Sequence, residues 1–283
     1  MNILVTGASG FVGNYLVECL LARGHSVVAV SRDADKARRC SWYGRARYLS
    51  RNIHADGRAL FDEADRPDAL IHAAWDKLDE YRDPSHFEAA AAEHYRFIRD
   101  LIDAGLGQCL VLGTCLEYGL QEGALHEGLE ARPVLAYPLG KHLLHEMLRG
   151  LQMHRSFSLQ WVRLFYLYGP GQRSTSLLGQ LEAALSAGRA VFDMSMGDQV
   201  RDYLPVTDVA RIVCAIAERW HFDGVVNCCS GKPITVRALV ERHLRDWHSS
   251  ITLNLGKYPY PSYEPREFWG DRTRLDQLLG ERR

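Results

Sequence analysis

The sequence predicts an α/β fold with a doubly wound parallel sheet and a smaller, mixed region toward the C-terminus. Short apolar runs alternate with amphipathic helical patterns, as expected of parallel strands that are buried on both faces. The opening apolar run, residues 3–5, is followed by glycines at three-residue spacing, Gly7, Gly10 and Gly13. The pattern becomes less regular after residues 166–171, which predicts the second, smaller region.

The glycine turn lies directly after the first predicted strand and directly before a helical pattern that stops at Gly24. Strand, turn and helix in this order aim free backbone N–H groups and a helix dipole at a phosphate. The first glycine permits the sharp turn, the second lets the backbone approach a pyrophosphate, and the third lets the helix pack on the strand. The context favours a dinucleotide site in a Rossmann-like sheet over an ordinary turn between strand and helix.

Composition narrows the class of protein. The chain has 283 residues, 47% apolar and 24% charged, as in an ordinary globular protein. A formal net charge of -1 predicts no nucleic-acid partner, and no apolar run reaches the roughly 18 residues of a membrane span. Because the chain opens on a strand of the fold, we expect no signal peptide. Seven cysteines without a C-x-x-C pair predict reduced thiols in a cytoplasmic protein and no metal ion.

The second predicted strand, residues 27–30, ends in Ser31 and Arg32. An acidic residue near this position usually holds the adenosine ribose of a bound dinucleotide. A hydroxyl and a guanidinium suit a 2′-phosphate better, which favours NADP(H) over NAD(H). Asp33 is close in sequence, and Arg32 could equally be a solvated surface residue.

Two further strands are predicted before the middle of the chain. Residues 53–56 are interpreted as a third strand that ends in Asp56, which could meet the adenine edge or simply open a turn. Residues 69–74 form a fourth strand, whose small Ala73 and Ala74 would let a cofactor lie across the sheet edge. His72 in this strand is expected to be structural.

The middle of the chain contains the candidate catalytic residues. A helix is predicted over 86–104, a strand over 109–112, and then a polar loop over 113–119 that contains Thr114. Tyr137 and Lys141 follow at helical i, i+4 spacing, which places the phenol and the ammonium on one face. Such a pair is usually a surface pair, but here it follows a nucleotide-binding half. A neighbouring cation would lower the pKa of the phenol, as acid/base catalysis requires.

The rest of the chain is divided more coarsely. Residues 1–163 are predicted to form the dinucleotide-binding domain, to which part of 205–227 returns, and residues 164–283 form mainly the substrate-binding region. Strands are expected at 159–165, 191–192 and 225–227, and helices at 177–187, 209–218 and 236–247. Thr207 or Asp208 is the expected N-cap of the second of these helices, and Thr235 that of the third.

In order and spacing, these motifs resemble the extended short-chain dehydrogenase/reductases, in the NAD(P)-dependent epimerase/dehydratase/reductase branch that acts on nucleotide-diphosphate sugars. The resemblance covers nearly all of the chain. It rests on Thr6-Gly7-x-x-Gly10-x-x-Gly13, Ile71-His72-x-Ala74, Thr114 before Tyr118-Gly119, Tyr137-x-x-x-Lys141, Arg163-x-Phe165 with Tyr168-Gly169-Pro170, and Arg201-Asp202-Tyr203 with Val206-x-Asp208-Val209-Ala210.

The resemblance implies a role for each matching residue. Tyr137 would be the acid/base on a sugar hydroxyl or ketone, Thr114 would hydrogen-bond the reacting oxygen, and Lys141 would hold the nicotinamide ribose. Together with the residues discussed above, the candidate cofactor contacts are Gly7, Ser9, Gly10, Phe11, Val12, Ser31, Arg32, Asp56, Ala73, Ala74, Lys141 and Phe165. The candidate substrate contacts are Trp75, Tyr166, Gln172, Arg173 and Arg201, and the resemblance implies that Arg201 pairs with the diphosphate. A homodimer through helices 86–104 and 137–153 is also implied.

Three departures from the family pattern bear on the reaction. The 4,6-dehydratases of this family carry an Asp-Glu pair where this chain has Cys115 and Leu116, so a dehydratase is rejected. Tyr166 stands where the family often has an asparagine, and His94 replaces the helix asparagine that often supports the lysine.

The resulting hypothesis is an NADPH-dependent reductase of a nucleotide-linked 4-keto-6-deoxy sugar. A nucleotide-sugar 4-epimerase that retains NAD is the first alternative. The second is a non-catalytic NADP-sensing protein, which is disfavoured because Tyr137 and Lys141 are both present. The substrate pocket is expected among loops 75–83, 166–176 and 257–269, where Trp75, Tyr81 and Tyr260 either line the pocket or simply pack.

Overall fold

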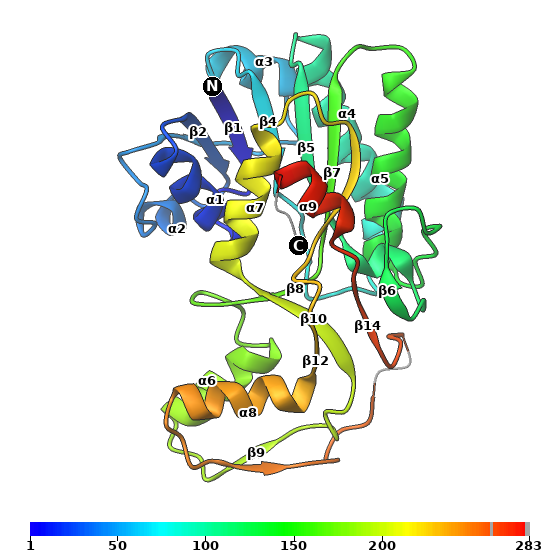
Figure 1. The fold of residues 1–283 in the computed structure, drawn as a ribbon. Helices are drawn as coiled ribbons and strands as arrows, with labels where there is room; N and C mark the ends of the chain where they lie inside the picture. The colour runs from blue at the N-terminus through cyan, green and yellow to red at the C-terminus, as the bar shows by residue number, and fades with distance from the viewer. Residues whose placement is uncertain (261–262, 281–283) are drawn as a thin grey trace.

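A parallel sheet of seven strands forms the centre of the molecule in the computed structural model, which describes residues 1–260 and 263–280 (Figure 1). The strand order is β11-β7-β5-β4-β1-β2-β3, so the winding direction reverses between β1 and β4. The predicted doubly wound fold is therefore confirmed. The strands are β1 (Asn2–Thr6), β2 (Ser26–Ser31), β3 (Arg47–Ser50), β4 (Ala69–His72), β5 (Gln108–Thr114), β7 (Ser158–Leu164) and β11 (Gly224–Cys228).

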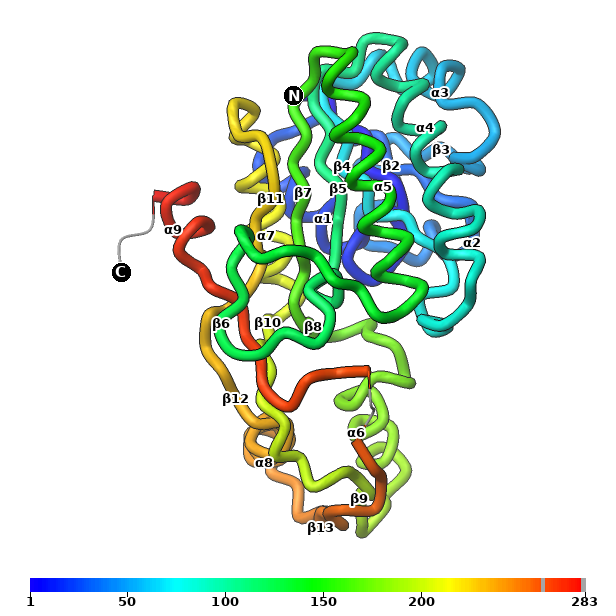
Figure 2. The backbone as a smooth tube through the Cα atoms, turned by 90° about the vertical axis from the view of Figure 1, so that its right-hand side faces the viewer, coloured from blue at the N-terminus to red at the C-terminus, as the bar shows by residue number. Residues whose placement is uncertain are grey.

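Helices cover both faces of this sheet (Figures 1 and 2). Ile3 and Val5 of β1 pack in one apolar core and Leu4 in another, because successive side chains of a strand point to opposite faces. The first core contains α1 (Phe11–Ala22), α2 (Ala34–Arg38), α7 (Val206–Ala217) and α9 (Thr273–Leu279). The second contains α3 (Gly57–Glu63), α4 (Ala91–Asp103) and α5 (Ala136–Gln152).

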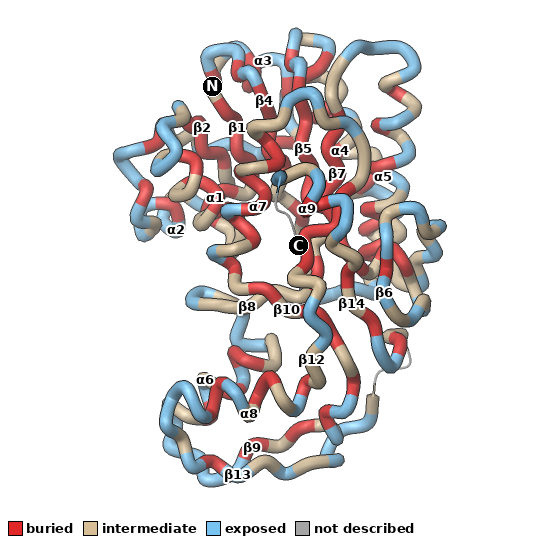
Figure 3. Tube along the Cα trace, viewed as in Figure 1, coloured by how far each residue is buried: buried red, intermediate tan, exposed pale blue. Residues whose placement is uncertain are grey.

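A smaller mixed region lies beyond the carboxyl ends of the large sheet and has an apolar core of its own. In Figure 3 the strands of the large sheet are mostly buried, whereas the outer turns of the small region are exposed. Its elements are β8 (Tyr166–Tyr168), β10 (Val200–Pro205) and β12 (Pro233–Thr235) in one sheet, the pair β9 (Val191–Asp193) and β13 (Thr252–Asn254), and helices α6 (Leu177–Ser186) and α8 (Val236–Asp246). The pair β6 (Gly123–Leu125) and β14 (Phe268–Gly270) ties the C-terminal segment to the loop before α5.

The third strand was predicted in the wrong place. β3 lies at Arg47–Ser50, whereas Asp56 is the N-cap of α3 and accepts a hydrogen bond from the Ala59 amide. None of the β3 residues is buried, so its weak apolar signal gave no pattern to detect.

Three other elements differ from their predicted form. Helix α7 begins at Val206 directly after β10, with Pro205 as its N-cap instead of Thr207 or Asp208. A π-helical turn, η1 (His86–Ala90), precedes α4, and the polar loop after β5 closes as a 3₁₀ turn, η2 (Cys115–Tyr118). Thr235 does cap α8, as predicted. Among the helices of the described residues, none is long and apolar enough to cross a membrane.

Candidate active site

A cavity of about 780 Å³ lies at the carboxyl edge of the large sheet, where the winding reverses. This is the edge at which doubly wound sheets bind ligands. Its walls are the glycine turn, the ends of β2, β4 and β5, the start of α5, and residues of β8 and α6. Most of the predicted site residues line it: Gly7, Ser9, Gly10, Phe11, Val12, Ser31, Arg32, Ala73, Ala74, Trp75, Thr114, Tyr137, Lys141, Phe165, Tyr166, Gln172 and Arg173.

The glycine turn has the tight geometry that its spacing predicts. Gly7 has a φ of +69°, and a Cβ there would lie 2.8 Å from the Ala74 amide nitrogen. A Cβ on Gly13 would lie 2.1 Å from the Gly7 carbonyl oxygen, so α1 could not approach the turn with any larger residue. Since the N-terminus of α1 faces the cavity through Phe11 and Val12, the turn fits a dinucleotide pyrophosphate.

The end of β2 forms the wall of the cavity expected to face the adenosine. Ser31 Oγ lies 3.2 Å from the Tyr48 hydroxyl, and Arg32 forms an exposed ion pair with Asp76, which follows β4. The charge of Arg32 is thus already partly neutralised. Asp56, expected at the adenine edge, is absent from the lining because its carboxylate caps α3.

Thr114, Tyr137 and Lys141 all line the cavity, and they come from two different elements, β5 and α5. Thr114 ends β5, and its Oγ1 accepts a hydrogen bond from the Leu116 amide at 3.3 Å. Tyr137 lies in the first turn of α5, and its ring stacks on that of Tyr81, with centroids 5.2 Å apart. Lys141 Nζ donates to the Leu112 carbonyl at 2.8 Å. All three side chains are buried.

Burial dominates the electrostatics of the pair. It raises the pKa of Tyr137 above its ordinary value, and the neighbouring Tyr81 raises this pKa further. It also lowers the pKa of Lys141 to about 7. The lowered phenol pKa expected from the sequence is therefore wrong for this structure, because burial of the Tyr137 hydroxyl dominates its pKa and the Lys141 ammonium donates to the Leu112 carbonyl. A neutral phenol beside the cavity is suited to donate a proton.

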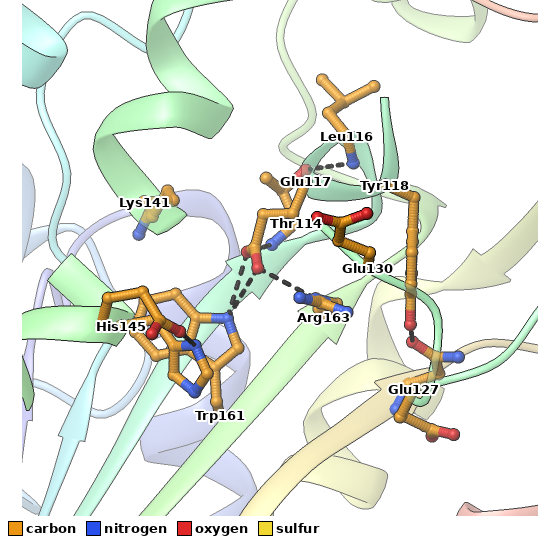
Figure 4. A network of polar contacts seen from close by, with 12 residues as sticks. Thr114, Leu116, Glu117, Tyr118, Glu127, Glu130, Lys141, His145, Trp161 and Arg163 are labelled. Atoms are coloured by element: carbon orange, nitrogen blue, oxygen red, sulfur yellow. Dashed lines mark hydrogen bonds and ion pairs between the residues drawn. The ribbon is translucent and has the colours of Figure 1, made fainter. Parts of the chain in front are cut away.

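Glu117 is fully buried behind Thr114 and holds the turn η2 in place after β5 (Figure 4). Its carboxylate accepts hydrogen bonds from the Thr114 amide at 2.8 Å, from Trp161 Nε1 at 3.1 Å and from Arg163 Nε at 2.9 Å. These contacts occupy both carboxylate oxygens, so this group is a structural anchor and not a proton donor. Arg163 belongs to the Arg163-x-Phe165 motif, but nothing in that motif indicates its pairing with Glu117.

His72 is structural, as expected, and takes part in a buried chain of polar groups. Its Nδ1 lies 2.8 Å from Thr6 Oγ1, and its Nε2 lies 2.9 Å from Nδ1 of His94. Burial holds the pKa of both imidazoles well below the ordinary value, so both rings are neutral. His94 also lines the cavity.

On the substrate side, Arg201 is withdrawn from the cavity. It is fully buried, and it donates to Glu264 at 2.8 Å and to the Val200 and Arg266 carbonyls. Glu264 lines the cavity in its place. Arg201 was expected to meet the diphosphate, whereas in this structure it is not among the lining residues and it pairs with Glu264, 63 positions later in the sequence.

Several residues that line the cavity were not predicted from the sequence. Tyr203 follows Arg201 at strand spacing, and that period of two could have suggested it. Nothing local in the sequence marks Glu264 or His54. Tyr81 lines the cavity, whereas Tyr260 donates to Asp198 outside it. Pro261 and Ser262, in the third expected pocket loop, lie outside the described residues.

The NAD dependent epimerase/dehydratase family model matches residues 3–229, more than half of the chain. The chain belongs to this family. Membership makes it an enzyme of the NAD(P)-dependent oxidoreductase type, and the glycine turn and cavity described above fit the nicotinamide dinucleotide that the family name implies.

Curated relatives of this family member extend over almost its whole length. It is 28% identical over 274 residues to a dTDP-6-deoxy-L-talose 4-dehydrogenase (NAD(+)) from Aggregatibacter actinomycetemcomitans, covering 95% of this chain and 99% of the relative. It is 30% identical over 272 residues to a dTDP-6-deoxy-L-talose 4-dehydrogenase (NAD(P)(+)) from Kitasatospora kifunensis, covering 92% of this chain and 83% of the relative.

Solved structures of other proteins have closely similar folds. An NAD-dependent NDP-hexosamine 5,6-dehydratase involved in tunicamycin biosynthesis superposes with a TM-score of 0.84 at 25% identity, covering 99% of this chain and 91% of that one. A UDP-glucose-4-epimerase from Stenotrophomonas maltophila gives a TM-score of 0.87 at 19% identity, covering 99% and 92%, which shows the shared fold alone.

Proposed function

We propose that this enzyme reduces the 4-keto group of a nucleotide-diphosphate 6-deoxy sugar, in a reaction that also runs in reverse. The observation that carries the proposal is that Thr114, Tyr137 and Lys141 all line one cavity, together with the sequestration of Glu117. This arrangement offers a phenol for proton transfer, but Cys115 and Leu116 offer no carboxylate for the elimination of water.

Each side chain has a distinct task in this reaction. Tyr137 protonates the oxygen of the sugar carbonyl as that oxygen gains charge, and Thr114 Oγ1 holds the same oxygen in place. Lys141 leaves the Leu112 carbonyl to bind the nicotinamide ribose, and its charge favours the phenolate that remains. The bound nicotinamide supplies the hydride. The apolar residues Phe165 and Leu116 help exclude water from this end of the cavity.

The names of the relatives support chemistry at C4 of a 6-deoxy sugar. The proteins from A. actinomycetemcomitans and K. kifunensis are called 4-dehydrogenases of dTDP-6-deoxy-L-talose. Dehydrogenation and reduction are the same hydride transfer in opposite directions, so a shared active site serves both. Which direction prevails depends on the supply of substrate and on the redox state of the cofactor pool.

We infer that NADP(H) is preferred, on the strength of Ser31 and Arg32 at the end of β2. A guanidinium there can form charge-assisted hydrogen bonds with a 2′-phosphate. The two relatives named above are described with NAD(+) and with NAD(P)(+), so the family itself does not decide the preference.

The alternative is a nucleotide-sugar 4-epimerase, which would use the same Thr114, Tyr137 and Lys141. It would retain its cofactor through a full cycle of oxidation and reduction. An uncharacterized UDP-glucose epimerase from Bacillus subtilis is 23% identical over 99% of this chain. Tightly held NAD in the purified protein, with sugar interconversion but no net redox change, would support this reading.

The deciding experiment follows nicotinamide absorbance with nucleotide-linked 4-keto-6-deoxyhexoses, using dTDP and GDP forms and both reduced cofactors. Wild-type enzyme should consume the cofactor, and Tyr137→Phe should lose turnover by about 10²–10⁴-fold while it keeps cofactor affinity. No cofactor consumption with any of these ketosugars, and no reverse reaction with the 6-deoxy sugars, would overturn the reductase proposal.

We also propose a homodimer through α4 and α5, as the family resemblance implies. Exposed apolar side chains support this surface, namely Leu143 and Met153 at α5 and Phe87 in the adjoining η1.

A further inference from the structure

Trp75 lines the cavity, where a substrate contact was expected, but its ring contacts Lys141. Only 8% of this residue is exposed, and its ring lies beneath the Lys141 ammonium. Lys141 Nζ is 4.1 Å from the centroid of this ring, which is the geometry of a cation–π contact. The ammonium therefore has two fixed neighbours, the Trp75 ring and the Leu112 carbonyl.

The Trp75 ring is itself held on its edge and on its face. Its Nε1 donates a hydrogen bond to His86 Nδ1 at 3.0 Å, and the ring stacks on His94, with centroids 4.5 Å apart and planes 9° apart. His86 Nε2 donates to the Glu80 carbonyl at 3.1 Å, so its Nδ1 is free to accept. These contacts leave the indole no freedom to turn away from Lys141.

The rings of Trp75 and His86 also contact the Tyr137 ring. The His86 ring packs edge-on against the phenol, with centroids 5.5 Å apart, and Trp75 does so at 6.2 Å. Gly140 makes this possible, because a Cβ at that position would lie 2.2 Å from the His86 carbonyl oxygen. The π-helical turn η1 and helix α5 thus meet at a glycine, one residue before Lys141.

We propose that Trp75 is the positioning residue for Lys141: its indole face holds the ammonium at the cavity wall, one helical turn from Tyr137, and His86 and His94 fix the indole. This inference deepens the proposed function, on which its relevance to turnover rests. It assigns Trp75 to the catalytic lysine and not to the sugar.

The other charged and titratable groups around Lys141 do not perform this task. Glu117 is the carboxylate that acts on the ammonium, but both its oxygens accept hydrogen bonds from other groups. His72 and His94 are neutral, and protonation of either would repel Lys141. The Trp75 ring therefore offsets part of the free-energy cost of burying the charged ammonium. A weaker attraction between the ring and the ammonium should lower the pKa of Lys141 further.

A lysine NMR titration tests the proposal without any substrate. The chain has five lysines, so labelling the lysine Cε carbons with ¹³C gives few signals, and Lys141→Arg identifies that of Lys141. Fluorinated tryptophans, with one, two or three fluorines on the indole, replace the native residue with nearly unchanged shape but a progressively weaker ring quadrupole. The pH midpoint of the Lys141 titration should fall stepwise with the number of fluorines. Over the whole series, the proton affinity of Lys141 should fall by about tenfold.

Two point variants test the effect of Trp75 on the Lys141 titration without fluorinated residues. Trp75→Phe keeps an aromatic face and should shift the Lys141 midpoint less than Trp75→Leu does. Trp220→Leu is the matched control, because Trp220 is 59% exposed and its ring packs on that of the neighbouring His221. This variant should leave the Lys141 midpoint unchanged. In the turnover assay, Trp75→Leu should lower kcat and move the pH limb assigned to Lys141, with KM for the sugar little changed.

The outcomes separate this inference from the proposed function. A Lys141 midpoint that is the same across the fluorinated series, or that rises with fluorine number, overturns the role of Trp75 even if the enzyme proves to be a reductase. A stepwise fall establishes the contact even if no ketosugar is turned over.

Discussion

At the scale of single residues, Lys141 illustrates what burial does to an ionisable side chain. Its ordinary pKa of 10.5 is lowered to about 7 by the loss of water around the ammonium. Between these two values the unfolded chain holds a proton that the folded protein has released. The unfolded state then binds more protons, so this residue makes the folded protein more stable as the pH rises from about 7 toward 10.5.

Replacement of Lys141 by methionine, which has a similar size and no charge, should therefore act on stability in a pH-dependent way. At pH 6 the wild-type folded protein carries the desolvated ammonium, so Lys141→Met should raise the free energy of unfolding. At pH 9 the gain in free energy of unfolding that Lys141→Met gives over the wild-type protein should be smaller by about 2–3 kcal/mol. Urea unfolding at the two pH values measures the difference, and an equal effect at both would show that the lysine titrates normally in the fold.

Arg32 and Asp76 give a second prediction at this scale. Their exposed ion pair at the mouth of the cavity contributes at most about 1 kcal/mol, so a cofactor phosphate can compete for Arg32. Asp76→Asn removes the competing carboxylate and should increase affinity for NADPH relative to NADH several-fold. Arg32→Ala should abolish the difference between the two cofactors. Fluorescence titration of both cofactors measures the ratio, and an unchanged ratio in both variants would mean that Arg32 does not contact the 2′-phosphate.

At the scale of elements, helix α5 joins the catalytic site to the packing of the sheet. Tyr137 and Lys141 lie one turn apart on its inner face, as their spacing predicts. The close approach of η1 at Gly140 fixes how far this turn can enter the site. The spacing of these two candidate catalytic residues was readable in the sequence, whereas the need for a glycine between them depends on η1, which comes from a different part of the chain.

The two glycines of α5 make a matched pair for a stability test. Gly140→Ala forces a Cβ to within 2.2 Å of the His86 carbonyl oxygen, so either η1 or α5 must shift. We expect a loss of about 1–3 kcal/mol in stability and reduced turnover. Gly150→Ala meets nothing within 4 Å and should be neutral or stabilising by up to about 1 kcal/mol. Thermal unfolding of both variants checks this, and equal effects would argue against the close packing.

At the scale of the whole molecule, the proposed homodimer can be tested at its expected surface. Leu143, on α5, is 38% exposed, and Leu143→Glu should place a charge in the interface and give monomers. Val191→Glu, on β9 in the small region, is the control, since Val191 is also exposed and lies outside α4 and α5. Light scattering after size exclusion measures the mass, and a monomeric wild-type protein would contradict the proposal.

The location of the active site between the two regions follows from the topology. The chain leaves the large sheet after β7, forms β8, α6, β9 and β10, and returns through α7 to β11. This path places residues of β8 and α6 opposite the glycine turn, across the cavity. The large sheet provides the wall proposed for the cofactor, and the small region provides most of the wall proposed for the sugar.

The sequence by itself determined the parts of this protein that depend on local pattern. The buried strands, the glycine turn and the spacing of Tyr137 and Lys141 all follow from periodicity and from backbone sterics within a few residues. Tertiary structure alone decided the pairing of Arg201 with Glu264, the burial of Glu117 against Arg163, and the Trp75 ring beneath Lys141. These contacts join residues 46 to 66 positions apart, for which local pattern carries no signal. Buried charges must nevertheless find partners, and the fold determines which partners lie within reach.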